Sequence, residues 1–194
     1  MVSQRDRPVS PELRDDQVRD RLTTDELITT CILLLNAGHE ATVHTIGNCV
    51  KTLLETGTAR ALSNPEAAPD STIEEVLRFD PALHMFTRWA YEDVEVMGHT
   101  FQRGDQVAAL LAAANRDPGV WDDPATFDPT RSPKPHVTFG GGLHFCVGAP
   151  LARLELQIAL PILFNRLPGL RLTEPPTYAD VYHFHGLKRL MVRA

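Results

Sequence analysis

The sequence predicts a mainly α-helical protein with small β-sheets, an α+β fold, because two long helical patterns flank one β-rich stretch. Helical periodicity runs from Thr24 to about Leu54 and returns from Val147 to Leu167. Short segments rich in β-branched and aromatic residues, separated by glycines, lie between the two. The 194 residues suffice for one domain with a sizeable core. We expect residues 1–23 to be a linker or frayed start and residues 24–194 to form the folded domain.

The first long helix has a defined beginning and end in the sequence. Thr24 is followed by Asp25 and Glu26, and acidic residues are favoured in the first turn of a helix. Its thirty or so residues would form a rod of roughly 45 Å. Gly57 is expected to end it. A second helix is expected over 71–78, because the Asp-Pro step that follows disfavours helical backbone.

The remaining elements are shorter. Strands are expected at 86–90, 94–97 and 107–111, with turns at Gly98 and Gly104. Residues 115–131 are rich in Asp and Pro and are expected to be irregular. Pro161 is expected to kink the last helix. The tail over 178–192 alternates weakly and is expected to close a small hairpin.

Composition excludes several classes of protein. Apolar residues make up 43% of the chain and charged residues 23%, which is ordinary for a globular protein. Three widely spaced cysteines without a visible targeting segment argue against a disulfide framework and for the cytoplasm. The apolar runs are too short for a membrane span. No basic run interleaves with aromatics, so nucleic-acid binding is not expected.

Charge is unevenly distributed along the chain. From residue 131 onward there are eight Lys or Arg against three Asp or Glu, whereas the first 130 residues hold eleven against twenty-two. A positive C-terminal third could steer an acidic protein partner by long-range attraction. A solvated surface with uneven charge explains the same count equally well.

The loop over residues 139–148, Phe-Gly-Gly-Gly-Leu-His-Phe-Cys-Val-Gly, carries most of the functional information. Three consecutive glycines let the backbone approach a flat, bulky group closely. Cys146 stands just before a helix, where unpaired N–H groups favour a thiolate. Such a thiolate suits a metal held in a planar macrocycle. The alternatives are a buried cysteine of the core, a zinc site with His136 and His144, and a cysteine nucleophile using His144 as base.

This loop resembles the heme-binding signature of the cytochrome P450 family, Phe-x-x-Gly-x-His-x-Cys-x-Gly. The matching residues are Phe139, Gly142, His144, Cys146 and Gly148. The resemblance implies that the Cys146 sulfur is the axial ligand of the iron of heme b (iron protoporphyrin IX). Thiolate ligation in this family favours O–O cleavage. His144 would donate to a heme propionate, and the signature residues, with Gly140, would shape the heme-binding surface.

A second motif lies midway along the first long helix, where residues 37–42 read Ala-Gly-His-Glu-Ala-Thr. A glycine inside a helix costs about 1 kcal/mol relative to alanine, so it needs a reason. The segment resembles the oxygen-binding motif of the same family, Ala/Gly-Gly-x-Asp/Glu-Thr. The resemblance implies that Ala37 and Gly38 abut the heme and that Glu40 supplies protons during dioxygen activation.

The motif departs from the family at one position. The threonine that usually follows the acid is replaced by Ala41, and the hydroxyl is displaced to Thr42. One residue along a helix is a rotation of about 100°, so Thr42 should point elsewhere. Either a helical bulge restores its direction, or a water or substrate hydroxyl takes over. Glu40 and Thr42 are therefore the candidate catalytic residues.

Two further resemblances follow in the family's order. Glu75 and Arg78 match the Glu-x-x-Arg motif, which implies a buried network tying their helix to the irregular segment 115–131. Arg88, in the expected first strand, would pair with a heme propionate. Substrate contacts implied by the resemblance are apolar: Leu83, Met85, Phe86 and Phe184. His183 and His185 are expected to be exposed or structural.

The resemblance extends over about 23–192 and implies the C-terminal half of a cytochrome P450 fold, since members are roughly twice this length. It implies a monooxygenase that uses dioxygen, electrons from a ferredoxin or similar donor, and a small apolar substrate. One alternative is a truncated heme-binding or interaction module without turnover. Another, motivated by Ala41, is peroxide-driven or non-oxygenase heme chemistry.

Overall fold

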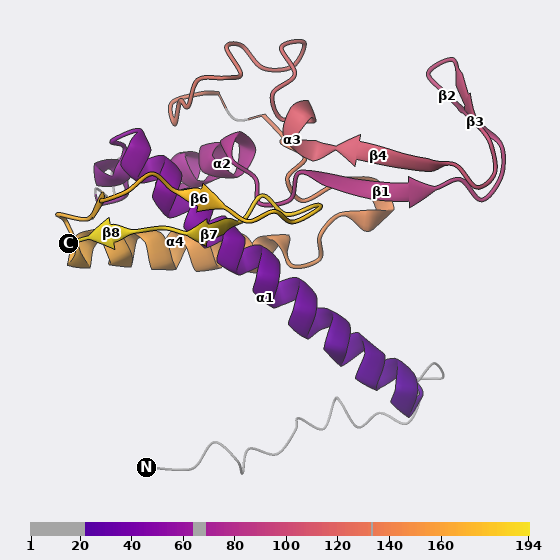
Figure 1. Cartoon of the computed structure of the whole chain (residues 1–194), viewed down its shortest axis with the longest axis horizontal. Coiled ribbons are helices and arrows are strands. Elements are labelled where there is room, and N and C mark those ends of the chain that lie inside the picture. The colour runs from indigo at the N-terminus through magenta and orange to yellow at the C-terminus, as the bar shows by residue number, and fades with distance from the viewer. Residues whose placement is uncertain (1–21, 64–68, 133) are drawn as a thin grey trace. The chain divides into compact units, whose positions relative to one another are not determined.

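The computed structural model describes residues 22–63, 69–132 and 134–194 of the chain (Figure 1). Most of the linker expected over residues 1–23 therefore lies outside the described residues. The chain divides into two compact units, residues 1–37 and 38–194. The described part of the first unit is the beginning of helix α1, and the second unit carries the other elements.

Helix α1 (Thr24–Glu55) begins and ends with local capping motifs. The Thr23 hydroxyl accepts a hydrogen bond from the Glu26 backbone at 3.2 Å, and the Glu26 carboxylate accepts one from the Thr23 N–H at 2.8 Å. This reciprocal pair is a capping box. At the other end Gly57 has a φ of +70°, and the Thr58 N–H donates to the Leu53 carbonyl at 3.1 Å. The predicted helix and its glycine stop are confirmed.

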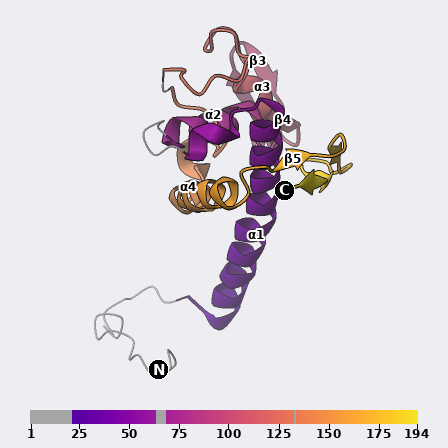
Figure 2. The same cartoon turned by 90° about the vertical axis from the view of Figure 1, so that its left-hand side faces the viewer.

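The hydrophobic core of the second unit lies where the end of α1 meets three other helical segments. These are a short 3₁₀ helix, η3 (Ala59–Ser63), α2 (Pro69–Phe79) and α4 (Ala149–Arg166). Figure 2 shows α2 beside α4, viewed nearly along α4. The core residues are Cys49, Val50, Leu53, Leu62, Ile73, Val76, Leu77, Leu156, Leu160 and Phe164. Pro161 lies inside α4, and the kink expected there stays a prediction.

Two antiparallel pairs form the β-rich stretch. Strand β1 (Met85–Trp89) pairs with β4 (Gln106–Leu110), and β2 (Val94–Val96) pairs with β3 (His99–Phe101). Sequence analysis missed β3. Met97 and Gly98 both have positive φ, of 52° and 80°, so they form a two-residue turn and the returning strand begins at once.

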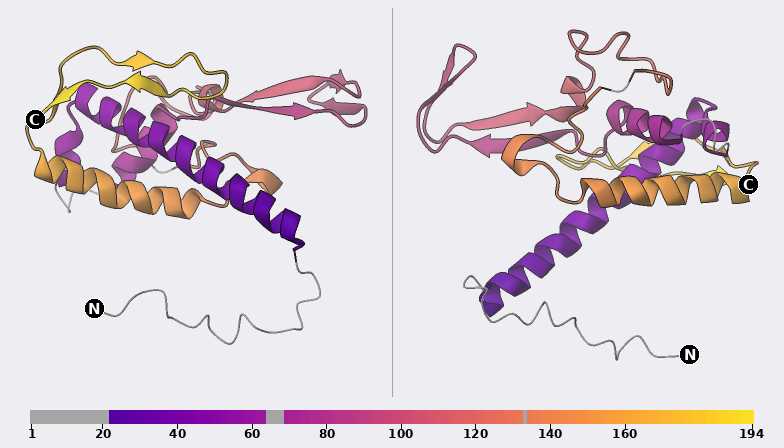
Figure 3. Two further views of the ribbon diagram at one scale, coloured as in Figure 1. Left: turned by 60° about the horizontal axis from the view of Figure 1, so that its bottom comes forward. Right: turned by 180° about the vertical axis from the view of Figure 1, so that it is seen from behind.

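The C-terminal tail closes the predicted hairpin and extends it. Strand β6 (Thr177–Tyr178) pairs with β7 (Leu187–Arg189), and outside them β5 (Arg171–Leu172) pairs with β8 (Val192–Arg193). Figure 3 shows these strands as one long, narrow pair. The turn between β6 and β7 folds back toward β1, where Phe184 forms a β-bridge with Leu83.

Residues 115–131, expected to be irregular, contain no helix or strand. After the single turn of α3 (Leu111–Ala114), the described residues reach a short 3₁₀ helix, η5 (Gly142–His144), without a further helix or strand. Helix α4 starts at Ala149, two residues later than predicted. Among the described residues, no helix has the length and apolar character needed to cross a membrane.

Candidate functional site

The cysteine loop is a compact turn closed by its own backbone. The Cys146 N–H donates to the Phe139 carbonyl at 2.9 Å. Gly140 and Gly142 have φ values of +73° and +61°, which side-chain-bearing residues rarely adopt. The glycines are thus needed for the turn itself, and they leave Cys146 exposed at its end.

The thiol precedes the helix instead of capping it. Helix α4 begins at Ala149, whose N–H donates to the Cys146 carbonyl at 3.2 Å. The Cys146 sulfur lies 3.8 Å from the position that a side-chain carbon would take on Gly148. A residue with a side chain at 148 would therefore contact the sulfur directly.

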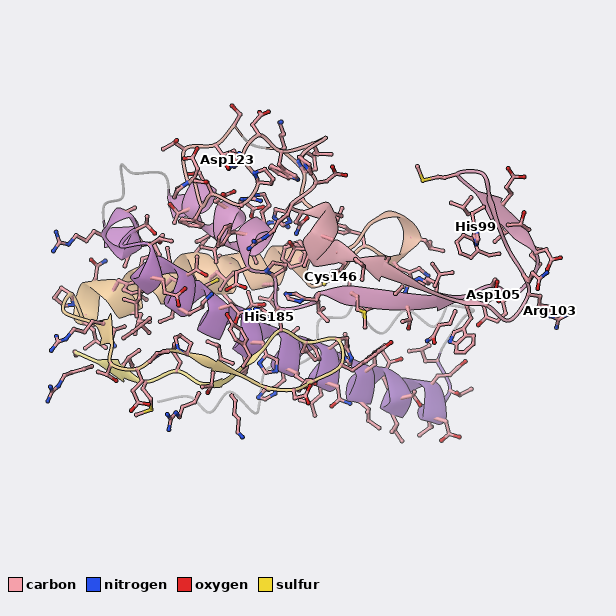
Figure 4. The ribbon with its side chains drawn as sticks, turned by 45° about the horizontal axis from the view of Figure 1, so that its top comes forward. His99, Arg103, Asp105, Asp123, Cys146 and His185 are labelled. Atoms are coloured by element: carbon pink, nitrogen blue, oxygen red, sulfur yellow. The ribbon has the colours of Figure 1, made fainter. Side chains whose placement is uncertain are left out.

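A pocket of about 760 Å³ lies between this loop and strand β1. Gly140, Gly141 and His144 form one side, and Arg88 on β1 contributes to the other. Figure 4 labels Cys146, which follows the loop residues that face this strand across the pocket. The structure therefore brings together three predicted residues of the heme site, His144, Arg88 and Gly140, and Cys146 belongs to the same loop with the rest of the signature. The pocket is completed by Phe86, Thr87, Trp89, Tyr91, Ala109 and Leu111.

The residues present fit a flat, largely apolar group that carries carboxylates. Among the described residues, no atom beyond the chain neighbours lies within 4 Å of where a side-chain carbon would be on Gly141 or Gly142, so open space faces this part of the cysteine loop. The same is true of Gly38 on α1, which does not line the pocket. The lining is mostly apolar, while Arg88 and His144 are the donors that could meet carboxylates. A heme has this combination of a planar apolar ring, propionates and an iron that takes a thiolate.

The structure does not bring the suggested zinc ligands together. Among the described residues, no group of three or more His, Cys, Asp or Glu side chains could hold a metal ion. His136, one of the suggested ligands, points its Nε2 at the Glu74 carboxylate 3.1 Å away and is 3% exposed. The core-cysteine alternative for Cys146 is wrong, because this thiol is exposed.

The α1 motif is regularly helical, so the bulge suggested to redirect Thr42 is absent. The helix is α-helical throughout Thr24–Glu55. Thr42 is half-buried, and Glu40 is exposed, with its Oε1 4.0 Å from the Nε2 of His44. Ala37 belongs to the first unit and is described only as part of the helix. The catalytic roles of Glu40 and Thr42 stay predictions.

The Glu-x-x-Arg motif is buried and joins the irregular segment, as predicted. Arg78 and Glu75 are 1% and 5% exposed, and they share two hydrogen bonds of 2.7 Å. The Arg78 guanidinium also donates to the backbone carbonyls of Asn115, Pro124 and Thr126 at 2.8 to 3.3 Å. A planar guanidinium with five donors can connect this many acceptors at once.

Glu75 completes the network from the other side. Its Oε1 accepts a hydrogen bond from the Asp128 N–H at 3.0 Å and lies 3.5 Å from the Nε of Arg131. The irregular segment therefore depends on two side chains of α2 for its shape. Asn115 extends the connection toward the cysteine loop, because its side chain bonds Val137 and Thr138 at 2.8 Å.

A cluster of aromatic and charged residues was missed by sequence analysis. The His185 ring stacks on His84 at 4.1 Å and on Tyr178 at 3.9 Å, and its Nε2 is 3.5 Å from the Asp80 carboxylate. Asp80 also accepts hydrogen bonds from Lys51 and Thr52. The expected structural role of His185 is confirmed, but its partners are far apart in sequence and no local pattern signals them.

Comparison with known proteins gives one consistent family. The family model for cytochrome P450 matches residues 69–171. The chain is 44% identical over 177 residues to the biotin biosynthesis cytochrome P450 of Bacillus subtilis (strain 168), covering 90% of this chain and 45% of that protein. It is 48% identical over 161 residues to nocardicin C N-oxygenase of Nocardia uniformis subsp. tsuyamanensis, covering 81% of this chain and 40% of that protein.

Solved structures agree with this result. The crystal structure of P450BioI in complex with an acyl carrier protein ligated to hexadec-9Z-enoic acid superposes with a TM-score of 0.83 at 44% identity, covering 89% of this chain and 46% of that chain. The cytochrome P450 CYP109B1 of Bacillus subtilis superposes with a TM-score of 0.84 at 40% identity, covering 90% and 48%. The chain spans a little under half the length of the relatives it matches.

Proposed function

The chain belongs to the cytochrome P450 family, and from that membership we propose that it forms the heme-thiolate half of a monooxygenase. The observation that carries the proposal is the exposed Cys146 at the end of a glycine turn, whose residues Gly140 and His144 line a pocket together with Arg88. We propose that the Cys146 sulfur is the axial ligand of heme b. His144 and Arg88 would donate hydrogen bonds to its propionates.

The bound heme would activate dioxygen and allow one oxygen atom to be inserted into a small apolar substrate. The protein's part is binding, orientation and proton supply. Gly140 and Gly142 adopt the positive φ values that the turn requires, and the Phe139 carbonyl closes it by accepting a hydrogen bond from the Cys146 N–H. The apolar side chains proposed to contact substrate, Phe86 and Phe184, lie on β1 and on the turn that bridges to Leu83.

Proton supply would come from α1, where Ala37 and Gly38 would also abut the heme. Glu40 is an exposed carboxylate with His44 one turn further along, so it can exchange protons with water. Since α1 is regular, Thr42 keeps the direction of its own helical position, and Ala41 offers no hydroxyl. A water or a substrate hydroxyl would then take over the hydrogen bond that the missing threonine makes in the family.

Electrons would come from a ferredoxin or a similar protein. The excess of Lys and Arg after residue 130 supports an acidic partner, because opposite charge accelerates association. The structural relative P450BioI is complexed with an acyl carrier protein, which shows that a protein of this family can engage a second protein. The cytoplasm is the proposed compartment.

A hemin titration tests cofactor binding directly. The wild-type chain should bind one heme per chain with a Soret spectrum typical of thiolate ligation. Cys146→Ser should lose that spectrum, whereas Cys31→Ser, which removes another exposed thiol, should keep it. Equal heme affinity and equal spectra in all three proteins would refute the proposal.

A second candidate is heme binding without turnover. Leu143 and Val147, on either side of Cys146, are 98% and 88% exposed, so the loop alone covers little of a bound group. The heme-loaded chain should be supplied with NAD(P)H and a surrogate ferredoxin chain, or separately with hydrogen peroxide. Product that depends on the electron chain supports the monooxygenase. Retained heme without product supports the second candidate, and equal yield with peroxide supports peroxide-driven chemistry.

A further inference from the structure

Three ionisable side chains from separate elements meet beneath the cysteine loop. Glu74 of α2 accepts two hydrogen bonds from the guanidinium of Arg153 on α4, at 2.6 Å from Nε and 2.9 Å from Nη2. His136, three residues before Phe139, places its Nε2 3.1 Å from the second Glu74 oxygen. The exposed fractions are 40% for Glu74, 31% for Arg153 and 3% for His136.

The Glu74–Arg153 pair is ionised at neutral pH. Partial burial opposes the charge of Glu74, but the hydrogen bonds from His136 and Arg153 outweigh it and lower the pKa of Glu74 to about 2. The hydrogen bond to Glu74 likewise raises the pKa of Arg153. A bidentate Arg–carboxylate pair also fixes the plane of the guanidinium.

The guanidinium of Arg153, oriented in this way, packs against the cysteine loop. The guanidinium carbon of Arg153 lies 4.6 Å from the centroid of the Phe139 ring, within cation–π range. Phe139 in turn accepts the Cys146 N–H through its carbonyl. The cationic end of the Glu74–Arg153 pair therefore lies against the first residue of the loop that carries Cys146.

We propose that Arg153, oriented by Glu74 and His136, is a positioning residue for Cys146. It holds Phe139 in place and keeps a positive charge against the loop that carries the proposed iron ligand. The inference rests on the proposed heme-thiolate function for its second part, the charge. The first part, the positioning of Phe139 and the cysteine loop, does not depend on the heme and can be tested in the heme-free chain.

The order of the loop is tested by hydrogen exchange in the heme-free full chain. Arg153→Leu should accelerate exchange of the Cys146 amide on the order of tenfold, because the cation–π contact with Phe139 and the ion pair with Glu74 are lost. Arg166→Leu, an exposed arginine further along the same helix, should leave this amide unchanged. Unchanged protection of the Cys146 amide in Arg153→Leu would overturn the proposal even if the heme function failed.

The charge is tested by the reduction potential of the bound heme. Arg153→Leu should shift the potential to lower values, since less positive charge then stabilises the reduced iron, and Arg166→Leu should not. Arg153→Lys keeps a charge but not the planar fork. It should restore most of the potential while its Cys146 amide still exchanges faster than in the wild type. A heme that binds through Cys146 with the same potential in wild type and Arg153→Leu would refute this part.

Discussion

Arg78 illustrates how one residue can determine the shape of a segment without secondary structure. It is almost fully buried, and it joins Glu75 to three backbone carbonyls of the segment that precedes the cysteine loop. A buried ion pair adds little by itself, but removing one partner leaves an uncompensated buried charge. The motif therefore supports the cofactor site through structure and not through chemistry.

Replacing this arginine should unfold or strongly destabilise the protein. Arg78→Met leaves Glu75 charged in a buried place, so the free energy of unfolding should fall by about 3–5 kcal/mol. Denaturant titration followed by circular dichroism measures this change. Arg103→Met, in the exposed turn before β4, is the matched control and should change stability by less than about 0.5 kcal/mol. A loss for Arg78→Met as small as that of the control would contradict the structural role.

His84 and His185 make stability depend on pH. Burial lowers the pKa of both side chains below the ordinary value of 6.5, and repulsion from His84 lowers that of His185 further. The attraction of Asp80 opposes this shift, while Arg116 adds to it for both and Lys51 for His185. The unfolded chain thus binds protons at a pH where the folded chain does not. The contribution of the two neutral histidines to the free energy of unfolding is fully present well above pH 6.5, and it is lost as the pH falls below that value.

This pH dependence can be measured by denaturant titration between about pH 7.5 and 5.5. The wild type should lose stability over this range, and His84→Phe should lose less, because it keeps an aromatic ring without a proton site. His99→Phe, in the exposed strand β3, should follow the wild type. The account would fail if His84→Phe and the wild type had parallel stability curves.

At the scale of elements, α4 contributes one face to the core. Leu160 is 1% exposed, whereas Ile158 on the same helix is 52% exposed. Leu160→Ala should lower the free energy of unfolding by about 2–5 kcal/mol through lost burial and a cavity. Ile158→Ala should lower it by less than about 1 kcal/mol. Similar losses in the two variants would show that α4 is not packed as described.

The C-terminal turn depends on a glycine where it crosses α1. A side-chain carbon on Gly186 would lie 2.1 Å from the Nδ1 of His44, so the ring and the turn must separate. Gly186→Ala should lower stability by about 1–3 kcal/mol and weaken binding of apolar ligands at Phe184. Gly169→Ala, whose new carbon would be 3.8 Å from its nearest neighbour, is the control. Equal stability of the two variants would contradict this packing.

The elements themselves were largely predictable from the sequence. Helix α1 has its capping box and glycine stop, and α2 ends at an Asp-Pro step, so local rules suffice there. Strand β3 was missed because its two-residue turn uses Met97 at positive φ, which is unusual for a residue with a side chain. The bulge suggested near Thr42 was wrong because nothing in α1 interrupts its hydrogen bonding.

At the scale of the whole molecule, the site divides into a predictable and an unpredictable part. Cys146, His144 and Gly142 lie within five residues, so a linear pattern could reveal them. Glu74 and Arg153, by contrast, are 79 residues apart, and only folding brings them together. The sequence therefore reveals the residues proposed to contact the cofactor, but it does not reveal Glu74 and Arg153, which are proposed to position the loop that carries them.

The central claim is that the sulfur of Cys146 ligates a heme iron. The carbon monoxide difference spectrum of the reduced, hemin-loaded chain tests it most directly, because the position of the Soret band distinguishes thiolate from other axial ligands. We predict a thiolate-type band for the wild type and for Cys31→Ser, and its loss in Cys146→Ser. A wild-type spectrum without that band, or an unchanged band in Cys146→Ser, would contradict the claim.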